Sequence, residues 1–209
     1  GAPGSAQEIP LPPAHPRVML TPELVQEIAR KVSGPFADEY KTLLETAGKG
    51  VDQLDNQWSI PGAFMEAGLA YLVERQLGRD GKPFAEKVLA NWRQPQWQQP
   101  GLTRHFGWQG LLYDWIHDAM TPDERVKFGE LLGEWVATWW KTAEVNIPRE
   151  GLWYNQHWGP IHLDVPHNRV ALTSKLFMSL ATAGNAGRFE DAVRTSIRSF
   201  YEKFQKDGL

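Results

Sequence analysis

Polar and aromatic side chains that suit carbohydrate binding gather in residues 144–167, a stretch without a helical hydrophobic pattern. It holds three of the six histidines, His157, His162 and His167, beside several aromatic rings. Sugar rings stack on aromatic faces, hydroxyls pair with amides, and a carboxylate or sulfate pairs with arginine or histidine. The stretch therefore predicts an ordered loop over a binding cleft. The candidate site residues here and at the adjoining helix start are Trp153, Tyr154, Asn155, Gln156, His157, Trp158, His167, Asn168 and Arg169.

A second long connection, residues 94–105, leads into an aromatic helix. Long connections in compact helical domains are usually functional or disordered. We expect this region to add Arg104, His105, Trp108 and Tyr113 to the same site. Because the formal net charge is −3, an acidic polymer must be attracted by a local basic cluster rather than by the overall field. That cluster is Arg104, His105, His157, His167 and Arg169.

Metal and nucleophile chemistry fit the pattern less well. The three histidines of residues 144–167 recur every five residues, which does not match the i, i+4 pair of a helical zinc motif, and prolines interrupt the stretch. A metal site built by loop geometry stays an alternative, but we expect no metal and no organic cofactor. The chain has no GxSxG nucleophile elbow and no glycine-rich phosphate loop.

A glycosidase with paired carboxylates is a further alternative, because helical barrels host such enzymes and four acids are available. Asp114 and Asp118 lie one helical turn apart, and we interpret them as solvated carboxylates on a helix face. Glu150 and Asp164 complete the set. Aromatic residues divide in a similar way: loop tryptophans are assigned to the site, whereas those on apolar helical stripes are assigned to the core. The core group is Trp115, Trp135 and Trp139.

Helices must position these groups. Thr21-Pro22-Glu23 and Thr121-Pro122-Asp123-Glu124 combine an N-cap threonine, a proline at the first helical position and an early acid. Apolar residues then recur at helical spacing in most of the chain, and no alternating strand pattern competes. The fold class is all-α, built of antiparallel helical hairpins. Helices are expected over residues 22–32, 61–78, 82–92, 106–120, 122–139, 168–183 and 188–206, with Leu24, Ile28 and Val32 on the apolar face of the first.

Length and composition set further bounds. A chain of 209 residues fits one domain or part of a larger one. The slightly acidic balance argues against a dedicated nucleic-acid binder, and no apolar run approaches the roughly 20 residues of a membrane span. The absence of cysteine excludes disulfides and thiolate chemistry.

The two ends of the chain suggest its context. Residues 1–14 are rich in glycine, proline and alanine, so we assign them to a flexible tail and residues 15–209 to a single domain. Ala6-Gln7-Glu8 suits a mature terminus after removal of a signal peptide, which predicts a secreted or periplasmic protein. The Asp207-Gly208 turn signal at the far end indicates truncation of a longer chain.

Three segments resemble one family. His15-Pro16-Arg17-Val18-Met19-Leu20-Thr21 leads into an acidic helical turn, residues 110–132 read GLLYDWIHDAMTPDERVKFGELL, and residues 165–184 read VPHNRVALTSKLFMSLATAG. Together they are similar to the heparinase II/III-like polysaccharide lyases, which include alginate lyase relatives. The resemblance covers most of the chain. It implies that residues 15–209 form part of an incomplete (α/α) toroid.

The resemblance also implies catalytic roles. The Asn-Asn-His element of the family falls on His167-Asn168-Arg169, where only Asn168 is kept, or on Asn155-Gln156-His157, where Asn155 and His157 match. We prefer Asn168 because a helix starts directly after it. The family's acid–base tyrosine would lie past Leu209, together with a C-terminal β-rich domain.

The implied reaction is β-elimination at a uronic acid of an anionic polysaccharide. Asn168, with Arg169 or a histidine, would neutralise the substrate carboxylate, and His157 or His167 is the candidate base. Without the tyrosine, this chain is expected to bind polymer and to cleave it weakly or not at all. A non-catalytic helical module that binds a glycan or a protein is the alternative from another class.

Overall fold

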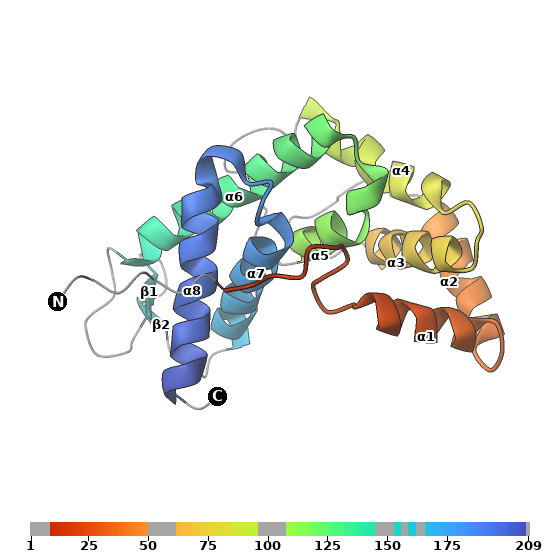
Figure 1. The fold of residues 1–209 in the computed structure, drawn as a ribbon, viewed down its shortest axis with the longest axis horizontal. Helices are drawn as coiled ribbons and strands as arrows, with labels where there is room; N and C mark the ends of the chain where they lie inside the picture. Colours follow the sequence, from red (N-terminus) through yellow and green to blue (C-terminus); the bar gives the residue numbers. More distant parts are fainter. Residues whose placement is uncertain are drawn as a thin grey trace.

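The fold was analysed in a computed structural model that describes residues 9–49, 62–95, 108–144, 153–155, 159–161 and 166–207. Helices dominate these ranges, as the sequence predicts, and a two-stranded hairpin is added to them (Figure 1). The helices are α1 (Pro22–Val32), α2 (Ala37–Lys49), α3 (Gly62–Gln76), α4 (Lys82–Trp92), α5 (Trp108–Trp115), α6 (Pro122–Glu144), α7 (Pro166–Thr182) and α8 (Glu190–Asp207). Two short 3-10 turns, η2 (His117–Ala119) and η3 (Gly187–Phe189), and the strands β1 (Trp153–Asn155) and β2 (Gly159–Ile161) complete the described elements.

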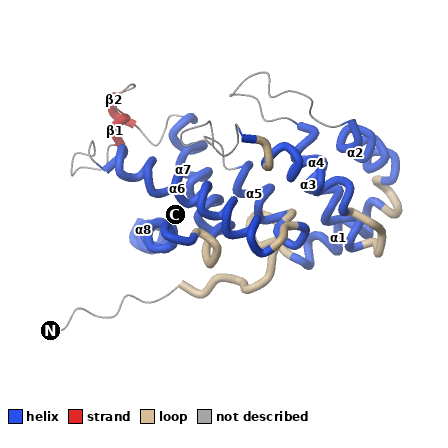
Figure 2. Tube along the Cα trace, turned by 90° about the horizontal axis from the view of Figure 1, so that it is seen from above, coloured by secondary structure: helices blue, strands red, loops and turns tan. Residues whose placement is uncertain are grey.

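Helix α5 lies between two groups of helices. On one side α3 packs against α1, α2 and α4, and on the other α7 packs against α6 and α8 (Figures 1 and 2). Helix α5 contacts both α3 and α7. All eight of its residues are buried, including Gln109 and Asp114. A helix covered on every side in this way is a core element rather than an amphipathic surface helix.

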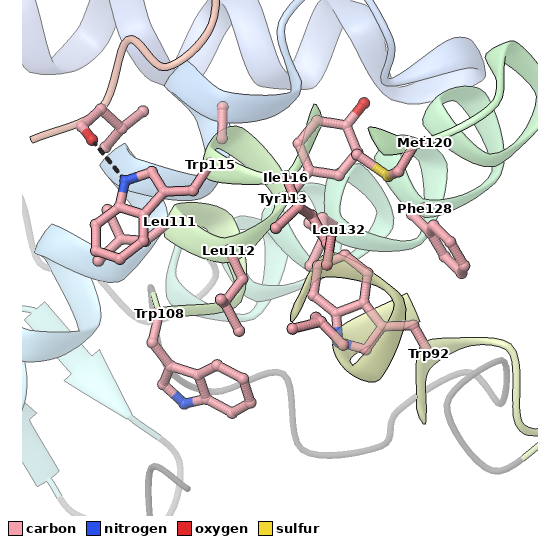
Figure 3. Packing of buried hydrophobic residues seen from close by; sticks show 14 of the residues in the cluster. Trp92, Trp108, Leu111, Leu112, Tyr113, Trp115, Ile116, Met120, Phe128 and Leu132 are labelled. Atoms are coloured by element: carbon pink, nitrogen blue, oxygen red, sulfur yellow. Dashed lines mark hydrogen bonds between the residues drawn. The ribbon is translucent and has the colours of Figure 1, made fainter. Parts of the chain in front are cut away.

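Aromatic side chains fill the core around α5 (Figure 3). Trp115 is 8% exposed, which confirms its assignment to the core. Trp135 is partly buried against the same cluster, and the side chain of Trp139 lies outside the described residues. The labelled members of the cluster are Trp92, Trp108, Leu111, Leu112, Tyr113, Trp115, Ile116, Met120, Phe128 and Leu132.

The backbones of α5 and α7 approach each other closely at Gly110. A β-carbon built on Gly110 would lie 2.9 Å from the backbone N and Cα of Met178. Any side chain at position 110 would clash with these backbone atoms of α7. Glycine therefore permits the close approach of the two helices. The two helices therefore pack in close contact in the middle of the molecule.

Several helix boundaries agree with the sequence and others do not. Helix α4 occupies its predicted range, whereas α2 is a helix that the sequence interpretation omitted. Helix α2 does carry a helical pattern in Tyr40, Leu43, Leu44 and Ala47, so the signal was present. The aromatic helix expected over residues 106–120 ends at Trp115 and continues as η2.

The buried face of α1 is rotated from the predicted one. Val25 and Ala29 are its buried residues, and Ile28 and Val32 are partly buried beside them. Leu24 is exposed. The predicted helical spacing is correct, but the first buried residue is Val25 rather than Leu24.

Residues 9–14, assigned from sequence to a flexible tail, belong to the packed domain in part. Ile9 and Leu11 are partly buried against the core cluster. The packed part of the chain thus includes residues that precede His15. Among the described residues, no helix combines the length and the apolar character needed to span a bilayer.

The N-terminus of α6 forms the predicted capping box. The amide of Glu124 donates to Thr121 Oγ1 at 3.2 Å, and the amide of Thr121 donates to Glu124 Oε2 at 2.9 Å. A Thr121→Ala substitution is expected to lower the free energy of unfolding by about 1 kcal/mol, because one cap acceptor is lost. Urea denaturation followed by circular dichroism measures this change.

Thr42→Ala in α2 is the matched control for this prediction. The Thr42 hydroxyl is exposed and donates within the helix to the Asp38 carbonyl, so it satisfies no free helix end. Its replacement is expected to change stability by less than about 0.5 kcal/mol. Equal losses from both substitutions would contradict a capping role for Thr121.

Candidate functional site

The residues that the resemblance assigns to catalysis lie at the start of α7. This helix begins at Pro166, so His167, Asn168 and Arg169 occupy its first turn. Proline is favoured there because its missing N–H would have no partner in the first turn. The predicted helix start is therefore correct to within two residues. The structure describes the backbone of this turn, and the contacts of the three side chains stay a prediction.

Part of the predicted loop is a β-hairpin. Strands β1 and β2 are antiparallel, with Trp153 opposite Ile161 and Asn155 opposite Gly159. This hairpin forms part of the predicted loop, and β1 contacts α6. Five peptide units join Ile161 to Pro166, so the hairpin lies within about 18 Å of the start of α7.

Two of the predicted substrate-binding residues are buried in the core. Tyr113 is fully buried, and its hydroxyl donates to the Arg125 carbonyl at 2.8 Å. Burial raises the pKa of this phenol above its ordinary value. Trp108 is 7% exposed and stacks against Phe64 at 6.4 Å between ring centroids. In this structure both side chains pack inside the domain rather than on its surface.

The other candidates fall outside the described residues. They are Arg104, His105, Gln156, His157 and Trp158, with the further histidine His162 and the two acids Glu150 and Asp164.

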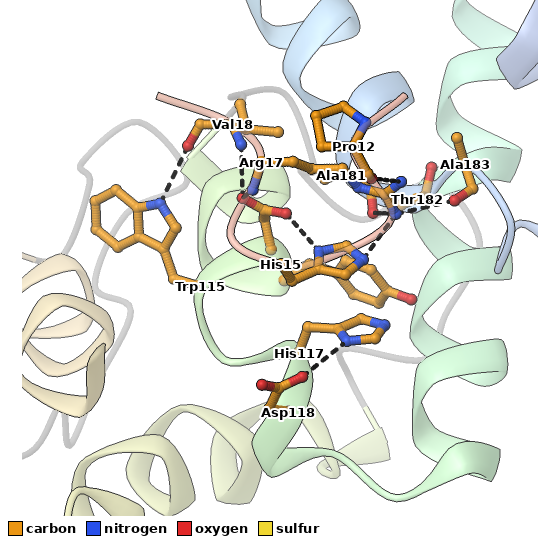
Figure 4. Close-up of polar contacts among 12 residues, drawn as sticks. Pro12, His15, Arg17, Val18, Trp115, His117, Asp118, Ala181, Thr182 and Ala183 are labelled. Carbon is orange, nitrogen blue, oxygen red and sulfur yellow. Dashed lines mark hydrogen bonds and ion pairs between the residues drawn. The ribbon is translucent and has the colours of Figure 1, made fainter. Parts of the chain in front are cut away.

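A buried carboxylate on α5 organises a polar cluster that the sequence interpretation did not assemble (Figure 4). Asp114 is fully buried and accepts three hydrogen bonds from the N-terminal segment. Its Oδ2 accepts from the amides of Arg17 and Val18, both at 2.8 Å, and its Oδ1 accepts from His15 Nδ1 at 2.5 Å. Burying a carboxylate is costly unless such donors compensate the lost water. Asp114 therefore anchors residues 15–18 to the core.

Arg17 fixes the tautomer of His15. Its Nη2 lies 2.7 Å from His15 Nε2 and also donates to the carbonyls of Ala183, at 3.0 Å, and Ala181, at 3.4 Å. A guanidinium can only donate, so His15 Nε2 accepts and His15 Nδ1 carries the proton given to Asp114. Burial lowers the pKa of Arg17, and the nearby Asp114 carboxylate opposes this effect. The group joins the N-terminal segment, α5 and the end of α7.

A second imidazole stacks on the first. The rings of His15 and His117 lie 3.7 Å apart between centroids and are inclined by 11°. Asn185 Nδ2 lies 3.4 Å from His117 Nε2, and Asp118 Oδ1 lies 3.5 Å from His117 Nδ1. Burial, with the neighbouring His15 and the positive charge of Arg125, lowers the pKa of His117 to about 4. His117 is therefore neutral at pH 7.

The cluster corrects the sequence interpretation of Asp114. The sequence predicts a solvated carboxylate on a helix face, whereas Asp114 is buried and bonded through both oxygens. A carboxylate with all of these donors in place has no free oxygen for a substrate proton. The paired-carboxylate alternative is thereby weakened, because half-exposed Asp118 is the one member of that set left at the surface of the described helices.

A signal for this buried acid was present in the sequence. Asp114 stands inside the run Leu111-Leu112-Tyr113-Asp114-Trp115-Ile116, where no polar face accompanies it. An acid inside an apolar run needs internal partners. Its partners are 96 to 99 residues away in the chain, so local patterns do not identify them.

Within the described ranges, no three histidine or acidic residues are arranged to hold a metal ion. The search for related proteins gave no support for any family: no family description, curated protein or solved structure matches this chain.

Proposed function

We propose that this chain is a helical, toroid-type domain of a polysaccharide lyase that binds a uronate-containing anionic polysaccharide. The proposal rests on the resemblance of three segments to heparinase II/III-like lyases. In the proposal, the first turn of α7 and the β1–β2 hairpin face the polymer, and a secreted or periplasmic location gives access to it. A C-terminal β-rich domain would complete the active site.

One structural observation supports the proposal. The three segments that carry the resemblance meet in a single contact cluster, although they are far apart in the sequence. Arg17 of the first segment bonds to Asp114 of the second and to the Ala181 and Ala183 carbonyls of the third. Trp115 Nε1 also donates to the Val18 carbonyl at 3.3 Å. Segments that depend on each other for packing are expected to be retained together in a fold.

The proposed chemistry places neutralisation at the start of α7. Asn168, with Arg169 or His167, would donate to the substrate carboxylate and make the adjacent C5 proton more acidic. A histidine such as His157 or His167 would then remove that proton. Trp153, Tyr154 and Trp158 would stack on sugar rings, and Asn155 is the second candidate for the neutralising role. No metal or cofactor takes part.

An Asn168→Ala variant tests the site. Loss of one hydrogen bond to a charged carboxylate is expected to weaken retention on a uronate polymer about tenfold. The measurement is retention on anionic and neutral polysaccharides, read together with the ultraviolet absorbance of an unsaturated uronate. The wild-type chain should be retained on a uronate polymer, less so at high salt, and should produce little absorbance.

Asn91→Ala in α4 is the matched control, because this asparagine lies in the other group of helices. It should leave retention unchanged. If the wild-type chain is retained on no polymer, the proposal fails and the protein-binding module is favoured. If Asn168→Ala binds as well as the wild type, the polymer site lies elsewhere.

A further inference from the structure

The N-terminal segment of residues 9–20, which we call the strap, crosses α5 and the C-terminal end of α7 (Figure 4). Apolar side chains hold part of it: Pro16 and Val18 are buried, and Ile9, Leu11 and Leu20 are partly buried. Its polar attachment is the hydrogen-bonded group of His15, Arg17 and Asp114. The docking of the strap therefore depends on that hydrogen-bonded group and on the His117 ring beneath it.

The bonding pattern is compatible only with a neutral His15. Its Nε2 accepts from Arg17, and its Nδ1 donates to Asp114. A proton added to Nε2 would place a donor against the donors of Arg17 and a second positive charge beside the guanidinium. These bonds therefore hold the His15 ring in a fixed position over His117.

His117 makes the docking of the strap sensitive to pH. The His15 ring covers it, and His117 is 8% exposed. The side chain of Arg125 lies close, with its Nε donating to the His117 carbonyl at 3.0 Å. The other groups that face His117 are Tyr113 on α5, Asp118 in η2 and Asn185 after α7.

Of these neighbours, Asp118 alone favours a charged His117, and its carboxylate is already bonded to Arg75 at 3.0 Å. Protonated His117 would thus lie in a largely unfavourable site beneath the strap. Opening the strap removes the covering His15 ring and lets water reach the imidazole.

We propose that the strap is a pH-sensitive latch, closed while His117 is neutral beneath the His15 ring and released when acid protonates His117. Release frees the Asp114 carboxylate and the carbonyls at the end of α7. It also uncovers Trp115, whose indole is bonded to the strap. This device is independent of the proposed polysaccharide chemistry.

The direction of the pH effect follows from linkage. The pKa of His117 is lower with the strap closed, so opening takes up a proton as the pH falls. If the pKa returns from about 4 to 6.5 on opening, the opening equilibrium should increase about 25-fold between pH 7.5 and pH 5. The stability that neutral His117 contributes to the closed strap is fully present above pH 6.5 and is lost progressively as the pH falls toward 4.

Hydrogen exchange of the Arg17 and Val18 amides measures this opening, because both donate to Asp114 in the closed state. After correction for intrinsic exchange, their protection should fall about 25-fold over this range. The Leu89 amide of buried α4 should change less than threefold, which separates strap release from global unfolding. Unchanged protection of Arg17 and Val18 would overturn the proposal.

A His117→Phe variant identifies the group responsible. Phenylalanine keeps a ring against His15 but does not titrate, so the pH response of the two strap amides should shrink to a small remainder. A full response in this variant would overturn the role of His117. If the variant does not fold, nuclear magnetic resonance of the wild type decides. The His117 ring should remain neutral at pH 5, and titration near 6.5 would overturn the proposal.

Discussion

An Asp114→Ala variant is expected to lose about 3–5 kcal/mol of its free energy of unfolding, the largest effect of any substitution considered. The substitution removes the acceptor of three hydrogen bonds at a fully buried position. It leaves two backbone amides and an imidazole N–H without a partner, and leaves the half-buried Arg17 charge uncompensated. Urea denaturation at pH 7.5, followed by circular dichroism, measures the loss.

Asp118→Asn is the control for Asp114, since this carboxylate lies one turn along the chain and its side chain is 46% exposed. Its ion pair with Arg75 is at the surface, so its replacement is expected to cost less than about 1 kcal/mol. Similar losses for the two variants would contradict the anchoring role of Asp114. Asp114→Asn should fall between them, because an amide oxygen still accepts from the strap amides.

The second large effect is expected at Gly110. A Gly110→Ala variant should lose about 1–3 kcal/mol although alanine is the better helix former. Its new methyl group would lie 2.9 Å from the backbone N and Cα of Met178 and 3.0 Å from the carbonyl carbon of Phe177. These are backbone atoms, so α5 and α7 must move apart to admit it. Thermal and urea unfolding of the variant measure the cost.

Gly48→Ala in α2 provides the comparison for Gly110. A β-carbon on Gly48 would have no atom within 4 Å, so the substitution changes helix propensity without changing packing. It should raise the free energy of unfolding by up to about 1 kcal/mol. A Gly110→Ala protein as stable as Gly48→Ala would show that the two central helices are less closely packed than described.

Local signals predicted most of the helices, and their success has a physical cause. Caps and helix-starting prolines act through neighbouring residues, so Thr21 and Thr121 located the starts of α1 and α6. Helix α2 also carries a helical pattern in its apolar residues, although it lacks a capping signal at its start. The hairpin of β1 and β2 has three-residue strands, too short for an alternating pattern to emerge.

Local sequence patterns could not predict the polar cluster, because its hydrogen bonds join distant parts of the chain. The bonds of Asp114 connect residues about 100 positions apart, and those of Arg17 reach Ala181 and Ala183 across still longer distances. The sequence places His15 and Arg17 in a family-like motif and Asp114 on a helix face. No local pattern indicates that Asp114 contacts the other two residues. For the candidate polymer site, sequence located the α7 start correctly, whereas Trp108 and Tyr113 proved to be core residues.

The long reach of Arg17 has a consequence for biosynthesis. Its partners Ala181 and Ala183 follow it by 164 and 166 residues, so a ribosome has to add them before the strap can close. At roughly 5–20 residues per second this takes on the order of 10–30 s. The strap leaves the ribosome before the described helices α1 to α8, yet it docks only after α7 has been made. During translation its buried valine and paired histidine are therefore exposed to chaperones and proteases, and a segment made before α1 is fixed in place only after α7.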